Sequence, residues 1–174
     1  LPFAHHRLGA RELRDERLEF ADLLAQGGRL VRARFLNLAS AGFEALKKSR
    51  PAAFMSAADA RLITIGNFDD DMKLLADCDW VVEAVAENLE IKQALLKKVE
   101  AAARQDAIVT TNTSGLPVGK IAEGFSPEFR KRWFGTHFFN PPRYMRLLEI
   151  IPTPEADPAA IAAVSHFGDV WLGK

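Results

Sequence analysis

The feature of this sequence that most constrains its fold is a pair of short apolar runs with a helical pattern between them. The first run, Trp80–Val85, carries apolar residues at both odd and even positions, as strands buried on both faces of a parallel sheet do. Asn88 then offers a helix N-cap, and apolar residues recur at helical spacing from Ile91 to Ala102. The second run is Ala107–Thr111. Because strand, helix and strand together form a βαβ unit, the sequence predicts the α/β class.

Similar signals continue the pattern along the rest of the chain. Short apolar runs predict strands, and acidic, Ser or Pro start signals predict helices. The strands expected are Arg61–Ile65, Trp133–Phe139 and Leu147–Ile151, and the helices follow Asp69–Asp71, Pro117, Ser126–Glu128 and Asp157-Pro158. We therefore expect a Rossmann-like, doubly wound, mostly parallel sheet.

The first part of the chain fits this pattern less well. Residues Arg11–Gln26 form an amphipathic helical pattern that ends at Gly27-Gly28. Arg29–Phe35 then alternates apolar and basic residues, which predicts a half-exposed strand. Such alternation is unusual for the first strand of a doubly wound sheet, because that strand is normally central and apolar.

Charge and cysteine content exclude several kinds of partner and site. The chain has 23 Lys and Arg against 23 Asp and Glu, which argues against nucleic acid as its main partner. The one cysteine, Cys78, excludes a disulfide framework and a Cys-based zinc site, and we predict no metal site. No uncharged apolar run reaches the roughly 18 residues of a membrane helix, and no signal peptide opens the chain. We expect a soluble, cytoplasmic protein without a membrane span.

Polar residues follow the predicted strands where ligands bind in open parallel sheets. Glu83 and Glu87 bracket the end of one strand, and Asn112–Ser114 follows another, although such Asn, Thr and Ser clusters usually form turns. His137 and Glu149 lie in two apolar strands, where a buried carboxylate requires a partner. A His–Glu pair suits proton abstraction, because the carboxylate fixes the imidazole tautomer and stabilises the imidazolium. A purely structural pair is the alternative.

Four segments carry a specific pattern, in one order: Asp77–Lys92, Thr111–Ser114, Gly135–Pro142 and Leu147–Ile151. Together they resemble the NAD-binding domain of the 3-hydroxyacyl-CoA dehydrogenase family. The resemblance covers residues 38–174 with near-family spacing. The Pro-Pro-Arg-Tyr run and Gly66–Asp69 look most like the large bacterial proteins that join this dehydrogenase to an enoyl-CoA hydratase.

The resemblance implies catalytic roles for three residues. His137 would be the general base that takes the proton of the 3-hydroxyl group, and Glu149 would pair with it and raise its basicity. Ser114 would donate a hydrogen bond to the substrate oxygen. A hydrolase triad of the same three residues is excluded by context, since the sequence around Ser114 lacks the G-x-S-x-G elbow that exposes a nucleophile.

The resemblance also implies NAD as the cofactor, with contacts from Glu87, Lys92, Ser114 and Asn140. Lys92 is the weakest of these, because a lysine in the first turn of a helix is often simply solvated. For Glu83 we favour a structural role as a strand-end carboxylate satisfied by neighbouring amides. The basic pair Lys47-Lys48 could meet a coenzyme A phosphate, but a solvated helix face is the simpler interpretation.

The sequence departs from the family at its beginning. A member opens with an apolar strand, a G-x-G-x-x-G loop and an acidic residue about 20 positions later, and this chain contains no G-x-G-x-x-G. Residues 1–37 therefore form an unmatched segment in place of the first nucleotide-binding unit. A misread frame or truncated gene, a genuine alternative segment, and loss of NAD binding are the three explanations. The Arg-rich character of residues 7–34 favours the first.

We expect a fragment of an NAD-dependent (3S)-3-hydroxyacyl-CoA dehydrogenase of fatty-acid β-oxidation, which oxidises 3-hydroxyacyl-CoA to 3-ketoacyl-CoA. The family's second, helical domain would supply dimer contacts in the full protein. Because the glycine loop and that domain are missing, we expect the isolated chain to be weakly active or inactive. The alternative is a non-catalytic remnant of the same fold that binds acyl-CoA or assembles with another subunit.

Overall fold

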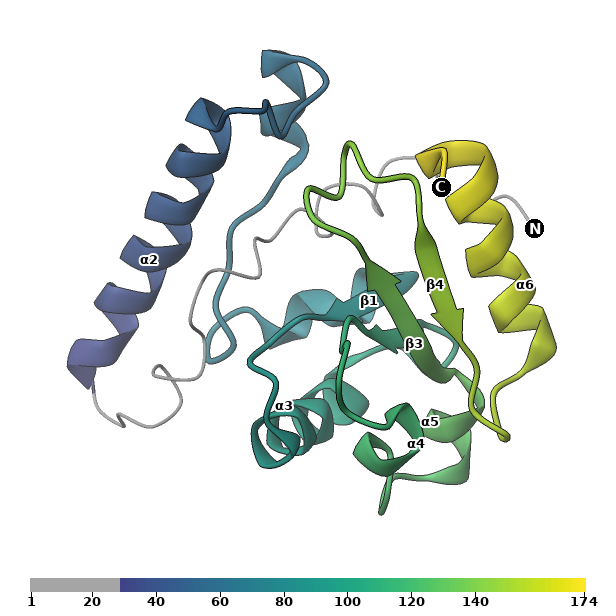
Figure 1. Cartoon of the computed structure of the whole chain (residues 1–174). Helices are drawn as coiled ribbons and strands as arrows, with labels where there is room; N and C mark the ends of the chain where they lie inside the picture. Colours follow the sequence, from purple (N-terminus) through teal and green to yellow (C-terminus); the bar gives the residue numbers. More distant parts are fainter. Residues whose placement is uncertain (1–28) are drawn as a thin grey trace.

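The computed structural model describes residues 29–174, and Figure 1 shows the arrangement of their helices and strands. The helix predicted at Arg11–Gln26 lies outside these described residues. The elements, in chain order, are α2 (Arg29–Lys48), η1 (Ala57–Leu62), η2 (Met72–Asp77), β1 (Trp80–Glu83), α3 (Leu89–Ala102), β2 (Ile108–Thr111), α4 (Val118–Ile121), α5 (Pro127–Lys131), β3 (Trp133–Phe138), β4 (Leu148–Ile151), α6 (Pro158–Phe167) and η3 (Gly168–Leu172).

The strands of the described residues form one sheet in the order β1-β2-β3-β4. β1 pairs with β2 and β2 with β3 in parallel, whereas β4 returns antiparallel to β3. The expected mostly parallel sheet is thus confirmed. Since the parallel strands share one direction, the carboxyl ends of β1, β2 and β3 lie at the same edge of the sheet.

Helices cover both faces of this sheet, as a doubly wound arrangement requires (Figure 1). On one face Leu96 of α3 and Phe129 of α5 pack with Val109 and Trp133, all of them buried. The opposite face is covered by α6 and includes Val164, with the strand residues Trp80, Ile108 and Phe134. Adjacent residues of the parallel strands β1, β2 and β3 therefore enter different cores, which explains why these strands are apolar at both odd and even positions.

Two strand predictions are wrong. Arg29–Phe35 lies in the helix α2 rather than in a strand. Leu, Arg and Ala are strong helix formers, and a run of seven residues does not separate a period of two from a period of 3.6 once the helix continues to Lys48.

The second wrong prediction is Arg61–Ile65. The η1 helix extends through Arg61 and Leu62, and residues 63–65 join no sheet. Asp59 stabilises this helical turn locally, because its carboxylate accepts hydrogen bonds from the backbone N–H of Ser56 at 2.8 Å and from the Ser56 hydroxyl at 2.9 Å.

Predicted helix starts are confirmed by their capping contacts. Asn88 Oδ1 accepts from the Ile91 N–H at 3.0 Å at the start of α3. Ser126 and Asp157 cap α5 and α6 in the same way, with Pro at the first helical position in both. Among the described residues, no helix is long and apolar enough to cross a membrane.

Removal of the N-cap of α3 should lower the stability of the fold. We expect Asn88→Ala to lower the free energy of unfolding by about 1 kcal/mol, because the Ile91 N–H loses its acceptor. Asn88→Ser, which keeps an acceptor oxygen, should lose at most half as much. Urea unfolding followed by tryptophan fluorescence measures both, and an equal loss in the two variants would contradict the capping role.

Candidate functional site

His137 and Glu149 face each other across the antiparallel strands β3 and β4. They are register partners, and His137 Nδ1 lies 2.8 Å from Glu149 Oε2. The His137 ring also packs against Phe139, with ring centroids 4.6 Å apart. When Nδ1–H donates to the carboxylate, Nε2 carries the lone pair and can accept a proton.

The two partners differ in exposure, which corrects one expectation. The His137 side chain is 19% exposed and the Glu149 side chain 49%. The apolar neighbours of Glu149 in the sequence predict a buried carboxylate. It is half exposed instead, since β4 is the last strand of the sheet.

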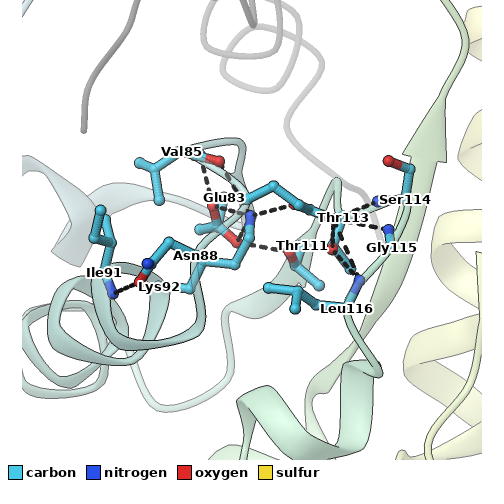
Figure 2. A network of polar contacts seen from close by, with 11 residues as sticks. Glu83, Val85, Asn88, Ile91, Lys92, Thr111, Thr113, Ser114, Gly115 and Leu116 are labelled. Carbon is cyan, nitrogen blue, oxygen red and sulfur yellow. Dashed lines mark hydrogen bonds and ion pairs between the residues drawn. The ribbon is translucent and has the colours of Figure 1, made fainter. Parts of the chain in front are cut away.

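A second polar group lies where β1 ends and contains a buried ion pair (Figure 2). Lys92 Nζ donates to Glu83 Oε1 at 2.9 Å, to Glu83 Oε2 at 3.1 Å and to the Val85 carbonyl at 3.1 Å, and both charged side chains are 1% exposed. The solvated interpretation of Lys92 is therefore wrong. The Glu83 carboxylate accepts a hydrogen bond from a neighbouring backbone amide, the Val85 N–H, as expected. It also accepts hydrogen bonds from Lys92 and, at 2.6 Å, from the Thr111 hydroxyl.

Glu87 extends this group to the loop that follows β2. Its Oε2 lies 3.4 Å from Lys92 Nζ. Its Oε1 accepts from the Thr113 hydroxyl and from three successive backbone N–H groups, those of Ser114 at 3.1 Å, Gly115 at 2.7 Å and Leu116 at 3.3 Å. Figure 2 shows the four donor residues, Thr113 to Leu116, side by side in this loop. One side chain thus holds the Ser114 loop in place.

These contacts keep Glu87 ionised. Desolvation opposes ionisation of the Glu87 carboxyl, but the hydrogen bonds from Thr113 and Gly115 and the charge of Lys92 outweigh it and lower its pKa from 4.5 to about 2. An anionic group with 42% of its side chain exposed therefore stands at the edge of the sheet.

Ser114 and Asn140 are exposed at the ends of β2 and β3. The structure thus brings Glu87, Ser114, His137 and Asn140 to the edge where the parallel strands end, the usual ligand position in this kind of sheet. Lys92 lies beneath them, behind Glu87. Among the described residues, no group of His, Cys, Asp and Glu side chains could hold a metal ion.

The turn after Asn140 has contacts that the sequence did not predict. Arg143 Nη1 donates to the carbonyls of Ala52 at 2.8 Å and Phe54 at 2.6 Å, and the Tyr144 hydroxyl donates to Ala52 at 2.9 Å. The β3–β4 connection is therefore tied to the chain that leaves α2. The sequence does not predict this role of Arg143, because its acceptors are backbone carbonyls about 90 residues earlier in the chain.

The basic pair at the end of α2 fits the simpler interpretation. Lys47 is exposed and forms an ion pair with Glu44, one helical turn earlier, and its ammonium lies 5.1 Å from the centre of the Phe43 ring. These local contacts account for Lys47 on a solvated helix face.

Comparisons with known proteins agree on one family. The family model for the 3-hydroxyacyl-CoA dehydrogenase NAD binding domain matches residues 31–174. A probable 3-hydroxyacyl-CoA dehydrogenase of Deinococcus radiodurans is 50% identical over 137 residues, which are 79% of this chain and 40% of that protein. A probable 3-hydroxyacyl-CoA dehydrogenase of Bacillus subtilis is 45% identical over 129 residues, 74% of this chain and 16% of that protein.

Solved structures share this fold. The crystal structure of M. tuberculosis FadB2 matches 91% of this chain and 57% of its own, with a TM-score of 0.67 and 24% sequence identity. At this identity the likeness concerns the fold alone. The chain spans less than half the length of the two sequence relatives.

Loss of the Lys92 ammonium should be more damaging than loss of the whole buried pair. We expect Lys92→Met to cost about 3–5 kcal/mol of unfolding free energy, because Glu83 is then buried without its counter-charge. The double variant Lys92→Met/Glu83→Gln should recover a large part of this loss. Chemical denaturation of the three proteins measures it, and a double variant as unstable as the single one would disprove the electrostatic explanation.

The stability contributed by Glu87 should depend on pH in the acid range. Because its pKa is lowered on folding, ionised Glu87 stabilises the fold fully above about pH 4.5, and this contribution is lost as the pH falls towards about 2. The stability difference between the wild type and Glu87→Gln should therefore be constant from pH 6 to 8 and shrink in acid. Urea titrations of both proteins at several pH values test this, and a difference that does not change down to pH 3 contradicts it.

Proposed function

The chain belongs to the 3-hydroxyacyl-CoA dehydrogenase family, and we propose that it supplies the proton-transfer site of an NAD-dependent oxidation of (3S)-3-hydroxyacyl-CoA to 3-ketoacyl-CoA. The observation that carries this proposal is the His137–Glu149 contact of 2.8 Å at the edge where the parallel strands end. A histidine held in one tautomer by a carboxylate is the group that such an oxidation requires for the hydroxyl proton.

In this proposal His137 is the general base. Its Nε2 accepts the proton of the substrate 3-hydroxyl, and its Nδ1–H remains bonded to Glu149. The carboxylate stabilises the imidazolium that forms, so the proton stays on His137 during the oxidation. Partial burial of the imidazole against Phe139 limits the motion of the ring and the access of water to it.

Ser114 is proposed to hydrogen-bond the substrate oxygen. Its loop is fixed through the three N–H groups that donate to Glu87, so the position of Ser114 follows that of Glu87. A donor held at a set place stabilises the developing ketone without having to reorganise during the reaction.

The residues at this edge fit the nicotinamide end of NAD. NAD, when bound, supplies the hydride acceptor. Glu87 offers an exposed ionised carboxylate for ribose hydroxyls, and Asn140 offers an amide on the His137 side. Lys92 takes part by holding Glu87. For the pyrophosphate the chain has no G-x-G-x-x-G loop, so the fit concerns the nicotinamide end only.

Several properties of the whole protein stay predictions. They are acyl-CoA as the substrate, a further helical domain with dimer contacts, and a cytoplasmic location. A non-catalytic module that binds acyl-CoA is the second candidate, and the missing glycine loop is the observation that favours it. Both candidates use the same fold but differ in whether the nucleotide binds.

NADH binding separates the two candidates. The chain is titrated with NADH while energy transfer from Trp80, Trp133 and Trp171 is followed. Saturable binding supports the dehydrogenase. No binding up to millimolar NADH in a chain shown to be folded, combined with retained acyl-CoA binding, supports the non-catalytic module and overturns the proposal.

Removal of the general base should abolish turnover without affecting the nucleotide. We expect the isolated chain to be weakly active or inactive; where NADH formation from (3S)-3-hydroxybutyryl-CoA is measurable, His137→Gln should reduce it by about 10²- to 10⁴-fold. Glu149→Gln should cause a smaller loss, because the imidazole remains. The NADH affinity of both variants should equal that of the wild type, and turnover unaffected by His137→Gln would exclude His137 as the base.

A further inference from the structure

β2 leaves the sheet at Asn112 although its neighbour β3 continues. The paired residues are Val109 with Trp133, Thr110 with Phe134 and Thr111 with Gly135. β3 runs on to Phe138, past His137. If β2 continued in the same register, the Phe138 N–H would donate to the backbone carbonyl of Thr113. The chain turns away before that point, so β3 loses a backbone partner next to His137.

The side chain of Asn112 replaces the missing carbonyl. Asn112 Oδ1 accepts from the Phe138 N–H at 2.8 Å. The backbone N–H of the same residue donates to the Glu83 carbonyl at 2.7 Å and so continues the pairing with β1. Asn112 therefore bonds to both neighbouring strands, to one through its backbone and to the other through its side chain.

Because the Asn112 side chain takes the place of a backbone carbonyl, two requirements of the site are met together. His137 needs β3 to stay in the sheet, because its partner Glu149 is set by the β3–β4 register. The Ser114 loop requires β2 to end, because the backbone N–H groups of residues 114–116 turn to donate to Glu87. The Thr113 carbonyl cannot accept from Phe138 while the Ser114 loop turns towards Glu87, because Thr113 belongs to the segment that turns away from β3.

We propose that Asn112 is a positioning residue for the catalytic pair: its side-chain oxygen holds the backbone at Phe138 and thereby keeps His137 in register with Glu149. This inference rests on the proposed function and deepens it. Asn112 does not touch the reacting atoms in this proposal. It acts through the peptide group that follows His137, and it couples the end of β3 to the start of the Ser114 loop.

Three variants of the chain test the proposal. Asn112→Asp keeps an acceptor oxygen at the same place, whereas Asn112→Leu has a similar volume and no acceptor. Asn112→Ala replaces the Leu variant if that variant does not fold, which tryptophan fluorescence and far-UV circular dichroism establish. Each protein is studied by amide hydrogen exchange at Phe138 and by the NMR signal of the His137 Nδ1–H, neither of which depends on turnover or on a bound nucleotide.

In Asn112→Leu we expect exchange at the Phe138 amide to rise about tenfold, since a net hydrogen bond of about 1–1.5 kcal/mol is lost. The His137 Nδ1–H signal should shift or broaden, and both features should be restored in Asn112→Asp. Exchange at residues of β1 and α3 should not change. Unaltered Phe138 exchange in the Leu variant overturns the proposal, and so do equal effects of Leu and Asp, because the acceptor oxygen would then not be what matters.

Kinetics give a second readout where turnover is measurable. Asn112→Leu should lower kcat and leave the KM for NAD within about twofold of the wild type, because the imidazole is misplaced while the nucleotide contacts remain. An increase in KM alone contradicts the proposal. If the folded wild-type chain binds no NADH, the proposed function fails, whereas the exchange and NMR results still decide whether Asn112 positions His137.

Discussion

The buried pair of Lys92 and Glu83 is the interaction on which Glu87 and the Ser114 loop depend. It joins α3 to the end of β1, and both side chains are almost completely removed from water. Such a pair is tolerated only when its remaining hydrogen-bonding capacity is used, and here Thr111 and the backbone of Val85 use it. The carboxyl ends of β1 and β2 are therefore fixed to each other and to the first turn of α3. Glu87, which binds the same ammonium, takes its position from this arrangement.

The sheet provides the two halves of the site by different means. The parallel strands bring loops to a common edge, and these loops need a side chain such as Glu87 to give them a fixed shape. The antiparallel pair of β3 and β4 places His137 opposite Glu149 through the ladder itself. The His137–Glu149 contact thus depends on strand register, whereas the shape of the Ser114 loop depends on the buried charges beneath it. Asn112, which bonds to the Phe138 N–H and to the Glu83 carbonyl, links the two halves.

Local signals in the sequence predicted the elements around this site, and longer-range geometry limited the prediction. The strand at Trp80 and the caps at Asn88 and Ser126 follow from residues close in sequence. The burial of Lys92 does not, because it depends on an acid in another element. A signal existed, since Lys92 lies at helical spacing with Leu95 and Leu96 on the apolar stripe of α3, where a cation requires a partner. Positions 29–35 failed for the opposite reason, because their alternation was too short to identify the period.

The residues proposed for proton transfer and those that would bind the pyrophosphate belong to different parts of the sheet edge. In this kind of sheet the first βα unit binds the pyrophosphate through a glycine-rich loop, and later strands face the nicotinamide. The sequence lacks the glycine signature, yet His137 and Glu149 retain their contact and Glu87 retains its loop. These later contacts form within strands and loops that follow β1, so they do not require the glycine loop in order to form. The His137–Glu149 pair therefore bears on the proposed reaction, whereas the free energy of nucleotide binding comes from a different part of the sheet edge.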